Sequence, residues 1–170
     1  MRAGLSGLDV RPAEPADLPS AYAVRHEVFV EEQGVPVELE YDDDDPSAHH
    51  AVAVLDGTVV GTGRLVTRPG RLGVIGRMAV VPPARGRGVG AALLALLERR
   101  AAEVGVETLE LHAQTHAVGF YRRAGYAAVG DAYEEAGIPH VTMRKPLATG
   151  TGPGAASANP GGPPEPDGIR

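Results

Sequence analysis

A run of alternating arginine and glycine, Arg85 to Gly90, most constrains how this chain can fold. It follows an apolar stretch, Val74 to Val81, and precedes an alanine- and leucine-rich segment that begins near Val89. Three glycines leave the backbone N–H groups uncovered, and the following helix directs the positive end of its dipole at the same loop. The pattern predicts a strand–loop–helix unit that binds a pyrophosphate, with Arg85 and Arg87 adding positive charge.

A dinucleotide is the competing ligand for such a loop. Gly86, Gly88 and Ala91 fit the glycine fingerprint of dinucleotide-binding folds, and Glu110 follows about 20 residues later. The run lies in mid-chain, however, and a dinucleotide fold needs two βαβ halves, for which this chain is too short. The two arginines also disfavour an ordinary strand-to-helix turn. We therefore expect a nucleotide-like cofactor other than a dinucleotide.

Length and composition exclude several classes of protein. The 170 residues suit one compact domain, and a net charge of −6 argues against general nucleic-acid binding. The chain has no cysteine, which excludes disulfides, cysteine nucleophiles and thiolate zinc sites. No stretch approaches the about 20 apolar residues that a membrane span needs, and the first ten residues lack the apolar core of a signal peptide. We expect a cytoplasmic protein with no membrane partner.

Turn signals and periodicity predict an alternation of strands and helices in the order β-α-β-β-β-α-β-α-β-β. Asp56-Gly57 between two apolar runs is a strong hairpin signal. Strict alternation over residues 107–114 indicates a strand with one polar face. The expected strands are 8–11, 51–55, 58–66, 74–81, 107–114, 126–133 and 140–145, the expected helices are 17–33, 89–104 and 115–124, and a polar loop covers 35–47.

The composition changes near the C-terminus, which sets the expected domain boundary. Eleven of the 23 residues from Ala148 to Arg170 are glycine or proline, and Ile169 is the only large apolar residue among them. Such a segment buries too little surface to offset its ordering entropy. We expect a folded domain over residues 8–147 and a disordered Gly/Pro-rich tail over 148–170.

Two motifs in the expected order identify a family resemblance. Arg85, Gly88 and Gly90 match the Arg/Gln-x-x-Gly-x-Gly/Ala pyrophosphate loop of the GNAT superfamily of acyl-CoA-dependent N-acetyltransferases, and Gly119 to Tyr126 matches its aromatic-rich turn. EVFVEEQGVP (27–36), GTGRLV, IGRMAV, LHAQ and EAGIPHVTM also resemble a small bacterial branch of mostly uncharacterised members. The resemblance covers roughly residues 8–147. It implies an α/β (α+β) fold, a mixed, mostly antiparallel sheet flanked by helices.

The resemblance also implies the reaction and the donor site. A GNAT enzyme transfers an acetyl group from acetyl-CoA to a primary amine by direct attack, with the donor in a V-shaped gap between two strands, here near 78–80 and 109–113. Tyr121 stands at the family's position for the acid that protonates the thiolate. The implied cofactor-binding residues are Met78, Ala79, Val80, Arg85, Gly86, Arg87, Gly88, Val89, Gly90 and Ala91.

Several polar residues are candidates for the acceptor site. His112 and Gln114 share the polar face of one strand, where a proton relay or acceptor contact competes with simple solvation. Arg64 and Arg77 are either solvent-face residues or a pocket for an acceptor carboxylate or phosphate. Glu27 and Glu31 on the first helix form either a solvated face or a binding site for a cationic amine.

Other features carry less weight. His140 is better explained as a satisfied surface or core histidine than as a site residue. The acidic run Asp42 to Asp45, with His49 and His50, lacks the glycine that a calcium loop requires, so we expect no metal. A non-catalytic acyl-CoA sensor is the alternative to an enzyme. The acceptor, a small molecule or a peptide amine, stays open, as does a homodimer.

Overall fold

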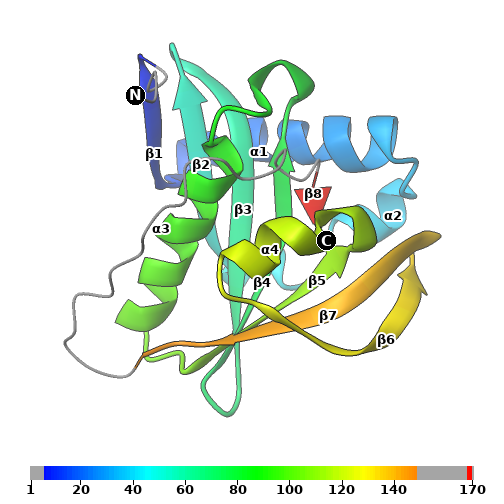
Figure 1. Ribbon diagram of the computed structural model, residues 1–170. Coiled ribbons are helices and arrows are strands. Elements are labelled where there is room, and N and C mark those ends of the chain that lie inside the picture. The colour runs from blue at the N-terminus through cyan, green and yellow to red at the C-terminus, as the bar shows by residue number, and fades with distance from the viewer. Residues whose placement is uncertain (1–5, 149–167, 170) are drawn as a thin grey trace.

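The computed structural model describes residues 6–148 and 168–169, which form one mixed sheet flanked by helices (Figure 1). The predicted order of strands and helices is confirmed, with one short helix and one short strand added. The strands are β1 (Leu8–Pro12), β2 (His49–Leu55), β3 (Thr58–Arg68), β4 (Leu72–Val80), β5 (Thr108–Gln114), β6 (Ala127–Glu135), β7 (Ile138–Pro146) and β8 (Gly168–Ile169); the helices are α1 (Leu18–Arg25), α2 (Val37–Glu40), α3 (Val89–Glu103) and α4 (Val118–Arg123).

The sheet is antiparallel except at one junction. Its strand order is β1-β2-β3-β4-β5-β7-β6, and β4 and β5 are the parallel pair, with α3 as the crossover between them. The predicted hairpin at Asp56-Gly57 joins β2 to β3, and both residues have positive φ (49° and 82°) as a tight two-residue turn requires. The residues predicted to border the donor gap lie on these two parallel strands.

Helices cover the two faces of the sheet and create two apolar clusters. Leu93 and Leu97 of α3 pack on β1 to β4, and the same core continues to Tyr121 on α4. On the other face, Val28 and Phe29 pack against Ala79 of β4. Figure 1 shows α1 and α3 on either side of β3. No helix among residues 6–148 is long and apolar enough to cross a membrane.

A bulge in β4 separates the two parallel strands. β4 pairs with β5 only from Leu72 to Ile75, which face residues 108–111. The β3–β4 register then shifts, and Arg77 takes a positive φ of 50°, so β4 bends after Gly76. Gly63 of β3 lies beside the bulge, and a Cβ there would collide with the side chains of Met78 and Leu97.

The structure differs from the sequence expectations at three points. The first helix changes after Arg25 to a π-helical segment, His26–Glu32. The expected polar loop over 35–47 contains α2 and a 3₁₀ turn, Asp45–Ser47. Most of the expected tail lies outside the described residues, but Gly168–Ile169 forms β8, which pairs antiparallel with β4. The sequence contains no signal for that pairing.

Buried ion pairs fix the segment that contains α2 onto the sheet. Arg25 on α1 is 1% exposed, and its guanidinium donates to Glu40 Oε1 (2.7 Å) and to Asp45 Oδ1 (2.7 Å). Arg64 on β3 donates to Asp42 (2.7 Å) and to the same Asp45 oxygen (2.8 Å), and Arg77 donates to Asp42 (3.2 Å). Because each buried charge has an opposite charge beside it, Asp45 of the acidic run lies in the folded interior.

The arginines also shift the acid titration of these carboxyl groups. Hydrogen bonds from Arg64, more than any other effect, lower the pKa of Asp42 from 3.8 to about 2. A carboxyl group with a lower pKa in the folded state stabilises that state above its unfolded pKa. The contribution of the Arg64–Asp42 pair is therefore complete above about pH 5 and is lost as the pH falls through about 2.

Breaking this network should cost much of the fold's stability. Asp45→Asn leaves the buried guanidinium of Arg25 with one carboxylate fewer, so the free energy of unfolding should fall by about 3 kcal/mol. Urea unfolding at neutral pH measures this loss. Asp43→Asn is the matched control, because Asp43 is an exposed neighbour in the same acidic run. Equal stabilities of the two variants would show that the buried pairs do not support the fold.

Candidate active site

The predicted phosphate loop forms a turn that presents backbone N–H groups at the start of α3. Gly86 and Gly88 have φ of 74° and 86°, a conformation that side chains disfavour. The N–H groups of residues 86–90 donate to no acceptor in the described part of the chain. Unused donors at a helix N-terminus favour an anionic ligand. The loop thus has the geometry that the sequence predicts.

Arg85 has a structural role in this loop. Its Nε donates to the carbonyl of Val80 (2.8 Å), and its two terminal nitrogens donate to the carboxylate of Glu32 (2.9 and 2.8 Å). Arg85 therefore ties the loop to the end of β4 and to the π-helical segment. The contact of Arg85 with phosphate stays a prediction. Arg87, the other arginine of the run, is exposed.

The end of β4 provides a strand edge beside the loop that β5 leaves unpaired. Met78, Ala79 and Val80 are at most 2% exposed and lie beyond the point where β4 and β5 separate. The β5 side of the gap therefore differs from the prediction. Residues 109–111 of β5 pair directly with β4, so the gap begins at His112. The short strand β8 pairs with Met78 and Ala79 and also contacts β5.

Tyr121 lies inside the core that α3 and α4 share. It is 0% exposed, and its ring makes edge contacts with Phe120 (5.0 Å) and Tyr126 (5.9 Å). Its helix contacts β5, one of the two strands that border the gap. A tyrosine that only packs in the core and a tyrosine that acts as a buried acid would both have these surroundings. The acid role of Tyr121 stays a prediction.

A second cavity lies on the other face, where β4 and β5 separate. It has a volume of about 380 Å³, and its lining includes Gly76, Arg77, His112, Glu135 and Ala136. His112 Nε2 lies 3.3 Å from Glu110 Oε2, and its ring stands edge-on to Tyr133. The structure thus brings His112 to a cavity next to the gap between β4 and β5.

The other predicted acceptor residues have different surroundings. Arg64 and Arg77 line the cavity, but their guanidinium groups already bind carboxylates. Gln114 is 1% exposed and exchanges two amide hydrogen bonds with Gln33 (2.7 and 3.3 Å). Glu27 and Glu31 are exposed and do not line this cavity, and Glu31 lies 3.5 Å from His26.

The sequence reasoning missed the contribution of the β6–β7 hairpin. Glu135 lines the cavity, and His140 lies behind it with 0% exposure. The turn residues Ala136 and Gly137 have φ of 52° and 76°, as a tight hairpin requires. The dipeptide Ala-Gly is a weak turn signal, and the length of the two strands is what brings Glu135 and His140 together.

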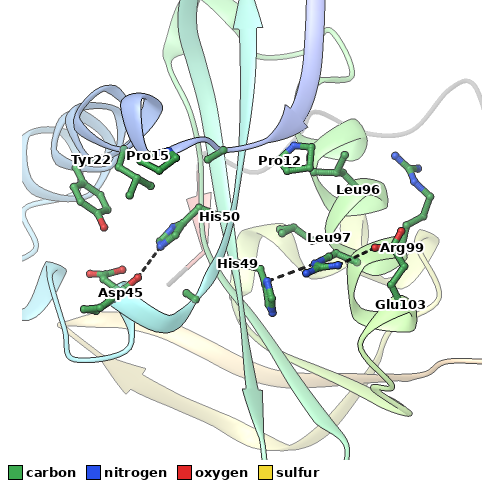
Figure 2. A pocket seen from close by; sticks show the side chains of 15 residues that line it. Pro12, Pro15, Tyr22, Asp45, His49, His50, Leu96, Leu97, Arg99 and Glu103 are labelled. Atoms are coloured by element: carbon green, nitrogen blue, oxygen red, sulfur yellow. Dashed lines mark hydrogen bonds and ion pairs between the residues drawn. The ribbon is translucent and has the colours of Figure 1, made fainter.

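The larger cavity, of about 460 Å³, lies at the other end of the sheet (Figure 2). His50 Nε2 lies 2.9 Å from the carbonyl oxygen of Asp45, and His49 Nδ1 lies 3.5 Å from Arg100 Nε. Burial, more than the nearby Arg100, lowers the pKa of His49. In residues 6–148 and 168–169, no three histidine, aspartate or glutamate side chains gather as a metal ion would require. This cavity contains none of the predicted site residues.

Comparisons with known proteins identify the family of the chain. The sequence profile of the acetyltransferase (GNAT) domain matches residues 14–147. The uncharacterised N-acetyltransferase YjcF of Bacillus subtilis is 40% identical over 129 residues, which cover 75% of this chain and 91% of YjcF. The crystal structure of an acyl-CoA N-acyltransferase from Pseudomonas aeruginosa superposes with a TM-score of 0.71 and 31% identity, over 81% of this chain and 98% of that one.

A third similarity lies outside these two genera. Escherichia coli ElaA superposes with a TM-score of 0.73 and 26% identity, over 81% of this chain and 99% of its own. Profile, sequences and structures thus converge on one family and one fold. The chain therefore belongs to the GNAT family and is an acyl-CoA N-acyltransferase.

Proposed function

We propose that this enzyme transfers the acetyl group of acetyl-CoA to a primary amine by direct attack of the amine on the thioester. The observation that carries the proposal is the loop of residues 86–90, whose N–H groups have no acceptor among the described residues and lie beside the separated strands. A pyrophosphate would accept from these groups, and the dipole of α3 would stabilise its charge.

The edge of β4 that β5 leaves unpaired is suited to the pantetheine arm. Beyond Ile75 no residue of β5 pairs with β4, so backbone groups of Met78 to Val80 could pair with an amide-containing ligand in place of β8. The arm carries two amides and extends from the pyrophosphate as a strand does. An N–H near Ala79 or Val80 would then polarise the thioester carbonyl.

The chemistry follows from this placement. The neutral amine attacks the thioester carbon, an N–C bond forms, and the C–S bond breaks. An ammonium acceptor loses two protons from its nitrogen during the reaction. A base passes one of them to the solvent, and the other goes to the sulfur of the leaving thiolate. In the proposed assignment Tyr121 gives the proton to the thiolate, and His112 takes part on the acceptor side.

A charged side chain in the loop should abolish donor binding. Gly86→Glu puts a carboxylate where the pyrophosphate would lie, so the affinity for acetyl-CoA should fall at least a hundredfold in calorimetric titration. Gly70→Glu is the matched control, because both glycines have positive φ (74° and 82°) and open space around the missing Cβ. Equal loss of affinity in both variants would contradict the loop assignment.

Removing the hydroxyl of Tyr121 should affect turnover more than binding. We expect Tyr121→Phe to lower kcat about a hundredfold with little change in the KM for acetyl-CoA, as measured by thiol release. Tyr126→Phe removes the neighbouring buried hydroxyl, which donates to Glu98 (3.2 Å), and should leave kcat nearly unchanged. Comparable kcat values in the two variants would make Tyr121 a packing residue.

The strand β8 has a direct consequence for donor binding. It pairs with Met78 and Ala79, the same backbone that we assign to the pantetheine arm. A chain that ends at Ala148 should therefore bind acetyl-CoA several-fold more tightly than the full chain. Gly168→Pro, which removes a backbone N–H from the pairing, should produce the same gain in calorimetric titration. Unchanged affinity in both would show that β8 does not compete with the donor.

A further inference from the structure

Two buried atoms on the β6–β7 hairpin lack hydrogen-bond partners within the described chain. Glu135 Oε2 and His140 Nε2 are both inaccessible to solvent, and neither is hydrogen-bonded. They lie 3.8 Å apart, beyond hydrogen-bond distance but close enough for strong interaction of opposite charges. Because buried polar atoms are rarely left unsatisfied, this pair needs a functional explanation.

The tautomer of His140 follows from the hydrogen bond of its other nitrogen. Nδ1 lies 2.6 Å from the carbonyl oxygen of Ile138, so Nδ1 carries the proton and donates it to that oxygen. In the neutral ring Nε2 is then the lone-pair nitrogen, and it is the atom that lies near Glu135. The ring is held in place by Tyr133, which stacks on it at 6.2 Å. His140 is thus an oriented proton acceptor.

Glu135 connects this histidine to the cavity. Its side chain is 40% exposed and lines the cavity together with His112, although its Oε2 is buried beside His140. The other lining carboxylates, Asp42 and Asp44, are paired with arginines. Among the described residues that line this cavity, Glu135 is therefore the carboxylate without an arginine partner.

We infer that Glu135 binds the ammonium group of a cationic acceptor and that His140 receives its proton, an inference that rests on the proposed acetyl transfer. The ammonium nitrogen transfers one proton through the Glu135 carboxylate to His140 Nε2. The products are a neutral amine, ready to attack the thioester, and an imidazolium that faces the carboxylate. The imidazolium later returns its proton to the solvent. The acceptor class is a primary amine that is protonated in solution.

Location near the reacting groups supports this assignment. Ile138 and Ala136 of the hairpin pack against the apolar cluster that contains Ala79 of β4. His140 pairs in register with Gln114 of β5, at the border of the donor gap. Glu135 touches the acceptor in this scheme, whereas His140 acts through Glu135 and is a positioning and proton-accepting residue.

Kinetics with a simple primary amine tests the inference. With acetyl-CoA and n-butylamine, Glu135→Gln should raise the KM for the amine at least tenfold. His140→Gln should lower kcat/KM about a hundredfold at pH 7 and recover as the pH nears the pKa of the amine itself. Glu134→Gln, an exposed neighbour, is the control and should behave as the wild type. Parallel pH profiles for wild type and His140→Gln would overturn the inference.

The pair can also be observed without turnover. Removing the carboxylate changes the surroundings of His140 Nε2 more than those of Nδ1, which donates to Ile138. Glu135→Gln should therefore shift the ¹⁵N NMR resonance of Nε2 and leave that of Nδ1 nearly unchanged. The other ionisable groups that contact the pair or line its cavity are Tyr133, His112, Asp42, Asp44, Arg64, Arg68 and Arg77, and Glu110 contacts His112. An unchanged Nε2 resonance would overturn the pairing. Failure of the wild type to bind acetyl-CoA would instead overturn the proposed function, and it would leave this NMR result unaffected.

Discussion

The separation of β4 from β5 is the constraint on which the rest of this structure depends. Two parallel strands that pair for only four residues leave the end of β4 without β5 as a partner, and its backbone donors and acceptors are open to another extended segment, as the pairing with β8 shows. The bulge at Arg77 produces the divergence, and the absence of a side chain on Gly63 makes room for Met78 beside it. One face of the separated strands meets the glycine loop, and the other meets the cavity lined by His112 and Glu135. Donor and acceptor can therefore approach the same point from opposite sides.

Buried charges stabilise the distorted part of β4. Arg77, at the bulge, donates to the carbonyl of Leu39 (3.3 Å) and to Asp42, so the segment around α2 is fixed to the bent strand. The same carboxylates neutralise Arg64, which would otherwise lie buried and unpaired. The arginines that resemble an anion pocket in the sequence are thus structural. In the proposed reaction, their neutralisation would leave Glu135 to set the charge preference of the cavity.

Features that depend on neighbouring residues can be predicted from the sequence, and features that depend on distant residues cannot. The glycine loop, the Asp56-Gly57 hairpin and the alternating strand β5 depend on neighbouring residues and could be predicted. The ion pairs could not, because Arg25 and Asp45 lie 20 residues apart and no local pattern links them. The positive φ of Arg77 has no sequence signal, since arginine rarely adopts it. His140 looked like a satisfied histidine, and only the fold shows that one of its nitrogens has no hydrogen bond.

Calorimetric titration of the purified full chain with acetyl-CoA, with NAD as the comparison ligand, tests the central claim most directly. The loop and the edge of β4 that β5 leaves unpaired predict micromolar binding of acetyl-CoA and no binding of NAD. Binding of NAD, or no heat from acetyl-CoA under conditions where the protein is folded, would contradict the assignment of the loop and of the strand gap to an acyl-CoA donor.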